Sequence, residues 1–215
     1  MRFRTTYSYK NIYPLLAMGI KQPKSVLKGV AGNFVDSENS SIDADTLLSD
    51  ALGSSGQFII KPSRADNGEG IRLLHLTEEG GQIDGTLFTT VKSLNLEYGD
   101  NFLVQENIQQ HRSLASPHPP SVNTLRIVTL RWKGKCHLLL AFARFGTGRA
   151  VNDNAGSGGI CVGIDEEGRL RSYAMNERAE KISQHPDTKY DFAIREKVPS
   201  FTDAVQLCLE GHRNV

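Results

Sequence analysis

The chain has 215 residues and a formal net charge of +1 at pH 7, from 25 Lys and Arg against 24 Asp and Glu. This balance excludes the strongly basic surface of a dedicated nucleic-acid or anionic-membrane binder. A chain of this length buries about 70% of its unfolded surface and needs no disulfide or metal to hold a core. With 39% hydrophobic residues and no apolar run near about 18 residues, we expect a globular protein without a spanning helix.

The chain contains three cysteines, Cys136, Cys161 and Cys208. They are too few and too far apart for a disulfide framework or a zinc ribbon. An odd number of thiols fits a reducing compartment, so we expect a cytoplasmic protein. The N-terminal residues lack the uninterrupted apolar region and the small-residue cleavage site of a signal peptide.

The first half of the chain predicts a mixture of strands and short helices. Residues 32–41 are rich in turn formers and predict a linker, after which Asp43 is expected to cap a short helix that ends at Gly53. Apolar segments at 58–60 and 71–76 predict two strands.

Residues 77–85 contain three glycines and predict another loop. Apolar residues one helical turn apart predict a helix over about 86–95. A further strand is expected at 102–106, followed by a polar loop at 109–121.

The second half predicts antiparallel hairpins. Residues 122–132 and 136–145 have strand character and are joined by a short turn. A second hairpin is expected from 159–164 and 169–175, and an amphipathic helix from Phe201 onward closes the chain. Strand-helix-strand material followed by hairpins indicates an α+β fold.

Lys61 lies at a strand end, directly before a glycine-bearing loop. An ammonium group and the N–H groups of such a loop can hold phosphates. Gly68 and Gly70 form only a generic G-x-G pair, and no Walker sequence follows, so a β-hairpin with an exposed lysine is an equal alternative. Glu106, at the next strand end, is placed to meet an adenine or ribose edge, although exposure to solvent is the simpler interpretation of that segment alone.

Arg126 and Arg144 each lie inside an apolar strand. Because burying an unpaired arginine is costly, each either points outward or meets an anion. Two arginines on one hairpin can clamp phosphate or carboxylate oxygens. Seven of the 20 glycines fall between Gly146 and Gly168, around Asp153, where they permit close ligand approach. The alternative is a long flexible hairpin loop, but we favour a functional one.

Several segments together resemble the sugar-transfer-associated ATP-grasp family, which is related to α-L-glutamate ligase-type ATP-grasp enzymes. They are FIIKPSRADNGEGI (58–71), FLVQENI (102–108), SVNTLRIVT (121–129), ARFGTGRAVNDNAGSGGI (143–160), GIDEEGRL (163–170) and HPDT (185–188). The resemblance implies an α+β, ATP-grasp-like fold with two lobes that grip ATP. Residues 1–56 would be an N-terminal segment and linker, 57–108 the ATP-binding lobe, and 109–215 the C-terminal lobe.

The resemblance also implies roles for individual residues. The nucleotide would be held by Lys61, Asp66, Asn67, Gly68, Gly70, Glu106, Asn107 and Ile108. Catalysis would depend on Arg126, Arg144 and Asn154. The substrate side would be lined by Asn123, Asp153, Gly158, Gly159 and His185, although a histidine in a turn such as HPDT more often stabilises the turn.

The chemistry implied for the family is phosphorylation of a carboxylate by ATP, followed by attack of an amine or similar nucleophile on the acyl phosphate. The cofactors would be ATP and Mg²⁺, which bridges phosphates. The partners would be ATP and a small carboxylate or sugar-linked substrate, with neither nucleic acid nor membrane.

Family members are expected to continue past a helix like 201–213 into strands bearing Trp-Asp and Glu-x-Asn, which hold magnesium. The present sequence ends at Val215, so we assign no metal ligand in it. We therefore expect a truncated or impaired form of such a ligase. The alternative is a non-catalytic nucleotide- or ligand-binding module.

Overall fold

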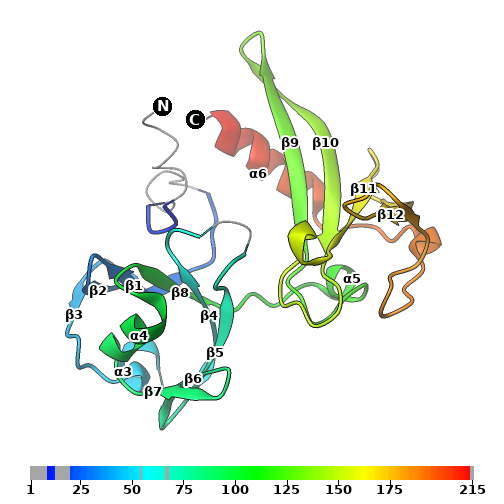
Figure 1. Ribbon diagram of the computed structural model, residues 1–215. Helices are drawn as coiled ribbons and strands as arrows, with labels where there is room; N and C mark the ends of the chain where they lie inside the picture. The colour runs from blue at the N-terminus through cyan, green and yellow to red at the C-terminus, as the bar shows by residue number, and fades with distance from the viewer. Residues whose placement is uncertain (1–8, 13–19, 54, 66–67, 214–215) are drawn as a thin grey trace. The chain divides into compact units, whose positions relative to one another are not determined.

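The computed structural model describes residues 9–12, 20–53, 55–65 and 68–213. The chain divides into two compact units, Met1–Ile108 and Gln109–Val215, here called unit 1 and unit 2. Each unit combines antiparallel strands with short helices (Figure 1). The α+β fold predicted from the sequence is therefore confirmed. No helix in the described part of the chain is both long enough and apolar enough to cross a membrane.

Unit 1 is built on a curled eight-stranded sheet in the order β3-β2-β1-β8-β4-β5-β6-β7 (Figure 1). The strands are β1 Ser25–Val30, β2 Asn33–Asp36, β3 Ser41–Ile42, β4 Gly56–Pro62, β5 Arg72–Thr77, β6 Gly80–Ile83, β7 Thr86–Phe88 and β8 Phe102–Glu106. All neighbouring strands are antiparallel. Strand β8 pairs with both β1 and β4, and so joins segments that are far apart in the sequence.

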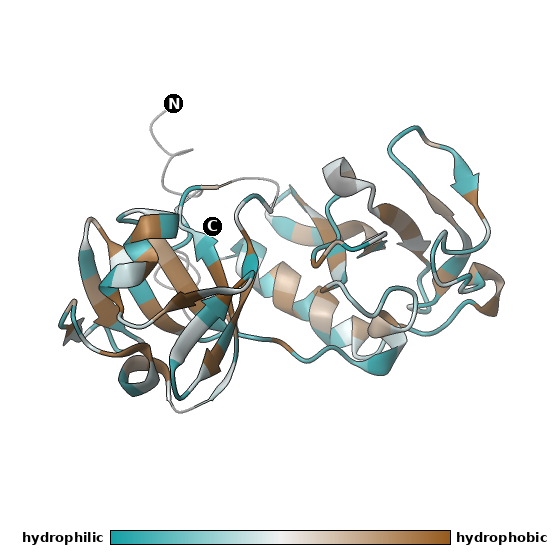
Figure 2. Ribbon diagram, turned by 60° about the horizontal axis from the view of Figure 1, so that its bottom comes forward, coloured by the Kyte–Doolittle hydropathy of each residue, from teal (hydrophilic) through white to brown (hydrophobic). Residues whose placement is uncertain are grey.

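The core of unit 1 lies inside this curled sheet and is closed by short helical segments. These are α3 Leu48–Leu52, η1 Lys92–Leu94 and α4 Asn95–Tyr98. Leu27, Ile60, Leu74 and Phe102 are fully buried there. Apolar and polar stretches alternate along the strands of both units, as half-buried sheets require (Figure 2).

The structure confirms the strands predicted at 58–60, 71–76 and 102–106, and Gly53 ends α3 with a φ of +101°. The cap predicted at Asp43 is wrong. Helix α3 begins at Leu48, and the Asp43 carboxylate instead accepts the Asp45 N–H at 2.9 Å within a turn.

The helix predicted over 86–95 is also wrong in its first half. Residues 86–88 form β7, and helical structure begins only at Lys92. Phe88 is buried while Leu87 is 46% exposed. The helical spacing was counted from Leu87, which faces the solvent and not the core.

Strands β2 and β6 were not predicted from the sequence, because both segments are rich in glycine and polar residues. The loop expected at 77–85 contains β6, where a Cβ on Gly81 would lie 2.6 Å from Leu74 Cδ1. Glycine occurs there because the neighbouring side chains leave no room, not because the chain turns. The stretch expected to be a turn-rich linker, 32–41, contains β2, whose inward residue is Phe34.

Unit 2 contains a five-stranded antiparallel sheet in the order β13-β12-β11-β10-β9. The strands are β9 Thr124–Trp132, β10 Lys135–Phe145, β11 Ile160–Ile164, β12 Leu170–Met175 and β13 Lys181–Ile182. The helices are α5 Arg112–Ala115, η2 Ala155–Ser157, η3 Phe192–Ile194 and α6 Phe201–Arg213. Both predicted hairpins and the final helix are confirmed. The polar loop expected at 109–121 contains α5, whose first turn is capped by His111.

The two faces of this sheet differ. One face carries Ala143, Phe145 and Val162, which are buried together with Phe192 and with Phe201 of α6. Helix α6 packs along β9 and β10 (Figure 1). The opposite face, called the outer face below, is formed by the alternate residues Thr124, Arg126, Phe142, Arg144, Cys161, Gly163, Arg171, Tyr173 and Met175.

Gly29 in β1 provides a test of the unit 1 core. A Cβ at this position would lie 2.7 Å from Cε1 of the buried Phe102 ring. We predict that Gly29→Ala lowers the free energy of unfolding by about 1–3 kcal/mol through overpacking, measured by urea denaturation. The Phe102→Leu background shortens the opposing side chain, so the same alanine should cost less there. An equal cost in both backgrounds would contradict this explanation.

Candidate functional site

Lys61 lies in β4, opposite Leu103 of β8, with a half-buried side chain. Its ammonium makes no hydrogen bond or ion pair with a residue that the structure describes. Burial lowers the pKa of Lys61, and the nearby Lys10 cation lowers it further. The Lys10 backbone N–H donates to Ser63 O at 3.0 Å, and its ammonium donates to Ala65 O. Two cations thus lie beside the start of the loop that joins β4 to β5.

The loop after β4 needs its glycines. Gly68 and Gly70 have φ values of +78° and +69°, which glycine adopts most readily. A Cβ on Gly70 would also lie 2.7 Å from Pro62 Cγ. The other two predicted loop residues, Asp66 and Asn67, lie outside the described residues.

Glu106, Asn107 and Ile108 close unit 1 at the end of β8. Glu106 Oε1 accepts the Lys24 N–H at 2.9 Å, although the residue is exposed. Asn107 Nδ2 donates to Gln57 Oε1 at 3.4 Å, and the side chain of Ile108 is exposed. Hydrogen bonds therefore connect Glu106 to the residue before β1 and Asn107 to β4.

Arg126 and Arg144 are diagonal neighbours on the outer face of unit 2. Arg126 lies opposite Phe142, and Arg144 lies opposite both Thr124 and Cys161. Burial raises the pKa of the Cys161 thiol, while the charges of Arg144 and Arg126 oppose that shift. Both guanidinium groups therefore lie near the Cys161 thiol. The structure thus brings Arg126 and Arg144 together on one sheet face.

The two arginines differ in their partners. The side chain of Arg144 is only 11% exposed and lies 3.3 Å from the Asp153 carboxylate. Its Nη2 also donates to Asp153 O at 2.8 Å and to Asn154 Oδ1 at 3.2 Å. Arg126 is exposed, and no described residue accepts a hydrogen bond from it. Arg144 is fixed to the chain around 153–154, and Arg126 keeps its donors available.

Asp153 and Asn123 are bound to the protein itself. Asp153 Oδ2 accepts the Thr124 N–H at 2.8 Å and also the Thr124 hydroxyl. Asn123 Nδ2 donates to Leu114 O at 2.7 Å and to His118 O at 3.0 Å, and its Oδ1 accepts the Gly146 N–H at 3.2 Å. Both side chains are buried. They hold the backbone of residues 146–159, called the glycine loop below.

Two stacked histidines hold the same loop. His185 and His118 are buried, with ring centroids 5.3 Å apart. His185 Nε2 is 2.9 Å from Gly146 O, and His118 Nε2 is 3.1 Å from Gly148 O. Asp187 Oδ2 accepts the Gly148 N–H at 2.7 Å. Because its polar atoms contact the protein, His185 stabilises the turn and the loop in this structure.

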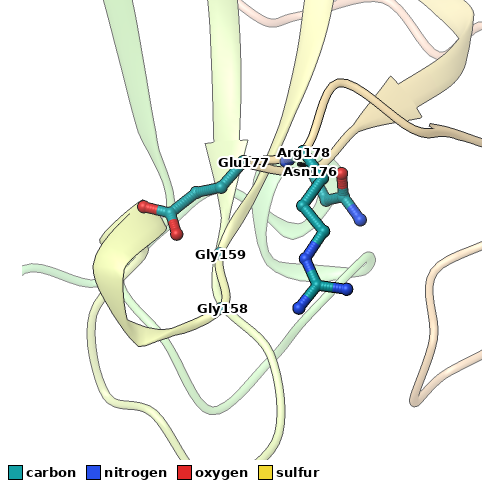
Figure 3. Close-up of a pocket in the computed structure, with 5 residues that line it drawn as sticks. All are labelled: Gly158, Gly159, Asn176, Glu177 and Arg178. Carbon is teal, nitrogen blue, oxygen red and sulfur yellow. Dashed lines mark hydrogen bonds between the residues drawn. The ribbon is translucent and has the colours of Figure 1, made fainter.

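Gly158 and Gly159 line a hollow of about 230 Å³, together with Asn176, Glu177 and Arg178. Glu177 and Arg178 are exposed and extend to different sides of the two glycines (Figure 3). A Cβ on Gly159 would lie 2.5 Å from Asp153 O. The glycine pair therefore presents backbone without side chains to this hollow. The Gly159 N–H donates to the backbone carbonyl oxygen of Asn154 at 3.1 Å.

Magnesium needs several oxygen ligands, mainly carboxylates and waters. Within the described ranges no group of three or more His, Cys, Asp or Glu side chains is placed to hold a metal ion. The buried carboxylate nearest the arginines, Asp153, is already bound to Arg144 and Thr124. These residues do not form a magnesium site.

The sequence analysis missed four residues of this network: His118, Ser121, Thr124 and Asp187. Ser121 Oγ accepts the Gly146 N–H at 3.2 Å and contacts His118 Nδ1 at 2.8 Å. The available signal was the segment HPPS directly before the strand that carries Arg126. Prolines fix the local backbone dihedrals, so they limit the directions in which the flanking His118 and Ser121 side chains can point.

The chain was compared with family models, curated proteins and solved structures. The family model described as sugar-transfer associated ATP-grasp matches residues 15–215, which includes all the candidate residues above. No curated protein and no solved structure matches the chain significantly.

His185 makes the stability of unit 2 depend on pH. Burial lowers the pKa of His185 from 6.5 in the folded state, so the unfolded chain binds this proton first. The contribution of His185 is therefore complete above about pH 6.5 and declines as the pH falls below it, by at most about 1.4 kcal/mol per pH unit. We predict this decline in urea-unfolding free energies between pH 7 and pH 5.

The matched variant is His185→Gln, which can still donate to Gly146 O but does not titrate. Its unfolding free energy should change less over the same pH range. Equal pH dependence in the two proteins would show that His185 is not the group that takes up the proton.

Proposed function

Because the chain belongs to the sugar-transfer associated ATP-grasp family, we propose that it is a ligase that activates a carboxylate with ATP. Membership supports an ATP-grasp ligase-like, sugar-transfer associated function in general, and proteins of this family generally bind ATP and Mg²⁺. The observation that carries the specific proposal is the pair Arg126 and Arg144 on one sheet face, with the glycine loop fastened to Arg144.

Lys61 is the proposed phosphate-binding residue. Its ammonium is half-buried, has no described anionic partner, and lies near Lys10. A polyanion would stabilise the charged form of a lysine whose pKa is lowered by burial and by a neighbouring cation. Gly68 and Gly70 belong to the proposed flap over the phosphates, and Glu106 to Ile108 to the proposed adenine contact. In this proposal 57–108 is the ATP-binding lobe, with 1–56 as its N-terminal segment.

Residues 109–215 form the proposed phosphoryl-transfer lobe. A carboxylate oxygen of the substrate attacks the γ-phosphorus, the bond from that phosphorus to the bridging oxygen of ADP breaks, and ADP leaves. The products are an acyl phosphate and ADP. Arg126 and Arg144 stabilise the charge on the transferring group, and positioning with charge neutralisation supplies most of the catalysis in such reactions.

The acyl phosphate is then attacked at its carbonyl carbon by an amine or related nucleophile, and inorganic phosphate leaves. Asn154 and the Gly158–Gly159 backbone are proposed to line the substrate side, next to the hollow described above. Asn123, Asp153 and His185 contribute to this side by holding the glycine loop, since their polar atoms contact the protein.

The proposed location is the cytoplasm, because three free cysteines are typical of a reducing compartment.

Cys161 provides a direct test because it lies next to Arg144 on the outer face. We predict that MgATP slows alkylation of Cys161 by iodoacetamide at least threefold, followed residue by residue with mass spectrometry. Cys136 and Cys208, elsewhere in unit 2, are internal controls. Equal slowing at all three thiols, or at none, would reject ATP binding at this face.

Lys61→Ala should weaken MgATP binding about tenfold, as expected for loss of one charge-assisted contact, measured by calorimetry. Lys92→Ala, which removes an exposed lysine of the same unit, is the control and should bind like the parent.

Formation of ADP with a carboxylic acid present distinguishes an enzyme from a binding module. Binding without ADP formation for any acid would favour the non-catalytic module.

A further inference from the structure

Arg171 is a third arginine on the outer face. Its side chain crosses β11 at Gly163, where an added Cβ would lie 3.1 Å from Arg171 Cδ and 3.4 Å from its Nε. The arm therefore lies flat against the sheet at a position that has no side chain of its own. A larger residue at 163 would push the arm away from the sheet.

The strand register places Arg171 near the two arginines of the proposed site. Gly163 pairs with Phe142, which pairs with Arg126 on β9. Neighbouring strands are about 4.8 Å apart, so the residue under the Arg171 arm lies about 10 Å from Arg126 across the sheet. The adjacent row contains Arg144, opposite Cys161. Three arginines, from β9, β10 and β12, thus lie on neighbouring rows of the same sheet face.

The charges on this area do not balance. Asp153 neutralises Arg144, and its other oxygen is occupied by Thr124. Arg126 and Arg171 have no anionic partner among the described residues. Lys181 lies over the Tyr173 ring at 4.7 Å and adds a further cation beside β12. Arg126 and Arg171 are therefore available to bind anionic groups of a ligand.

One transferring phosphoryl group and one reacting carboxylate meet at Arg126 and Arg144, which leaves Arg171 without a task. We propose that Arg171 binds a second anionic group of the substrate, so that the acid this chain activates is at least a dianion. The planar fork of an arginine suits bidentate binding of such an oxyanion. Arg171 is then a specificity residue. This inference rests on the proposed function, because it takes the reacting carboxylate to be at the other two arginines.

Three acids with the same six-carbon chain test the inference. D-gluconate has one carboxylate, D-glucarate has a second carboxylate at the far end, and 6-phosphogluconate has a phosphate there. Each is titrated against the full chain saturated with a non-hydrolysable ATP analogue, and protection of Cys161 from alkylation reports binding. We expect at least one of the two acids with a second anionic group to protect at a concentration at least tenfold lower than gluconate. The better of the two identifies the second group as carboxylate or phosphate.

Arg171→Gln should reduce this preference to within about twofold, while protection by the ATP analogue alone stays unchanged. Gly163→Ala keeps the charge but displaces the arm, and should also weaken the preference. Arg112→Gln, which removes an exposed arginine on α5, is the matched control and should retain it. Thermal unfolding of each variant checks that unit 2 remains folded.

Any of the following results would overturn the inference: equal protection by all three acids, no protection by any of them, or a preference for a second anionic group that survives Arg171→Gln. Weaker protection by the ATP analogue in Arg171→Gln would also overturn it, by placing Arg171 in the nucleotide site. If the analogue fails to protect even the unaltered chain, the proposed function is wrong. The same titrations without nucleotide then decide whether Arg171 binds a second anion.

Discussion

The backbone of Gly146 is the point at which three segments of unit 2 are held together. Its N–H donates to both Ser121 Oγ and Asn123 Oδ1, and its carbonyl oxygen lies 2.9 Å from His185 Nε2. A Cβ here would lie 2.6 Å from Ser121 Oγ. The start of β9, the end of β10 and the HPDT turn therefore meet at a residue that must be glycine.

The consequence of this junction is a glycine loop with a defined path. Buried polar groups are costly unless all of them are bonded, and a fully bonded network specifies one arrangement. The loop leaves Gly146, is held by His118 and Asp187 at Gly148, and returns to the sheet where Asp153 binds Thr124. Arg144 is fixed at that return, so the position of its guanidinium depends on contacts that begin at Gly146.

The sequence predicts the elements whose apolar residues repeat regularly, which are the two hairpins, the strands around Lys61 and the final helix. It does not predict β6, because Gly81 occupies a core position where Leu74 leaves no space for a side chain. It misplaces the start of the helix after Ile83, because Leu87 faces outward and Phe88 inward. In these cases tertiary packing, which a local pattern cannot show, decides the structure.

The same limit applies to the candidate site. Arg126 and Arg144 occupy similar apolar strand contexts, and the sequence left each of them either exposed or bound to an anion. Only the register and the path of the glycine loop show that Arg144 is paired while Arg126 is exposed. Likewise, Asn123 and His185 appear in motifs that suggest ligand contacts, but their partners are backbone groups 23 and 39 residues away.

The outer face therefore carries two kinds of arginine, one paired with a carboxylate and one exposed. An arginine paired with a carboxylate adds little net charge, but its direction is fixed, so it can place hydrogen-bond donors accurately. An unpaired arginine contributes its full charge but is held only by its stem. Arg144 belongs to the first kind and Arg126 to the second. Arg171 combines the two properties, because Gly163 lets the sheet support its arm without a neutralising partner. The proposed site therefore contains arginines of both kinds.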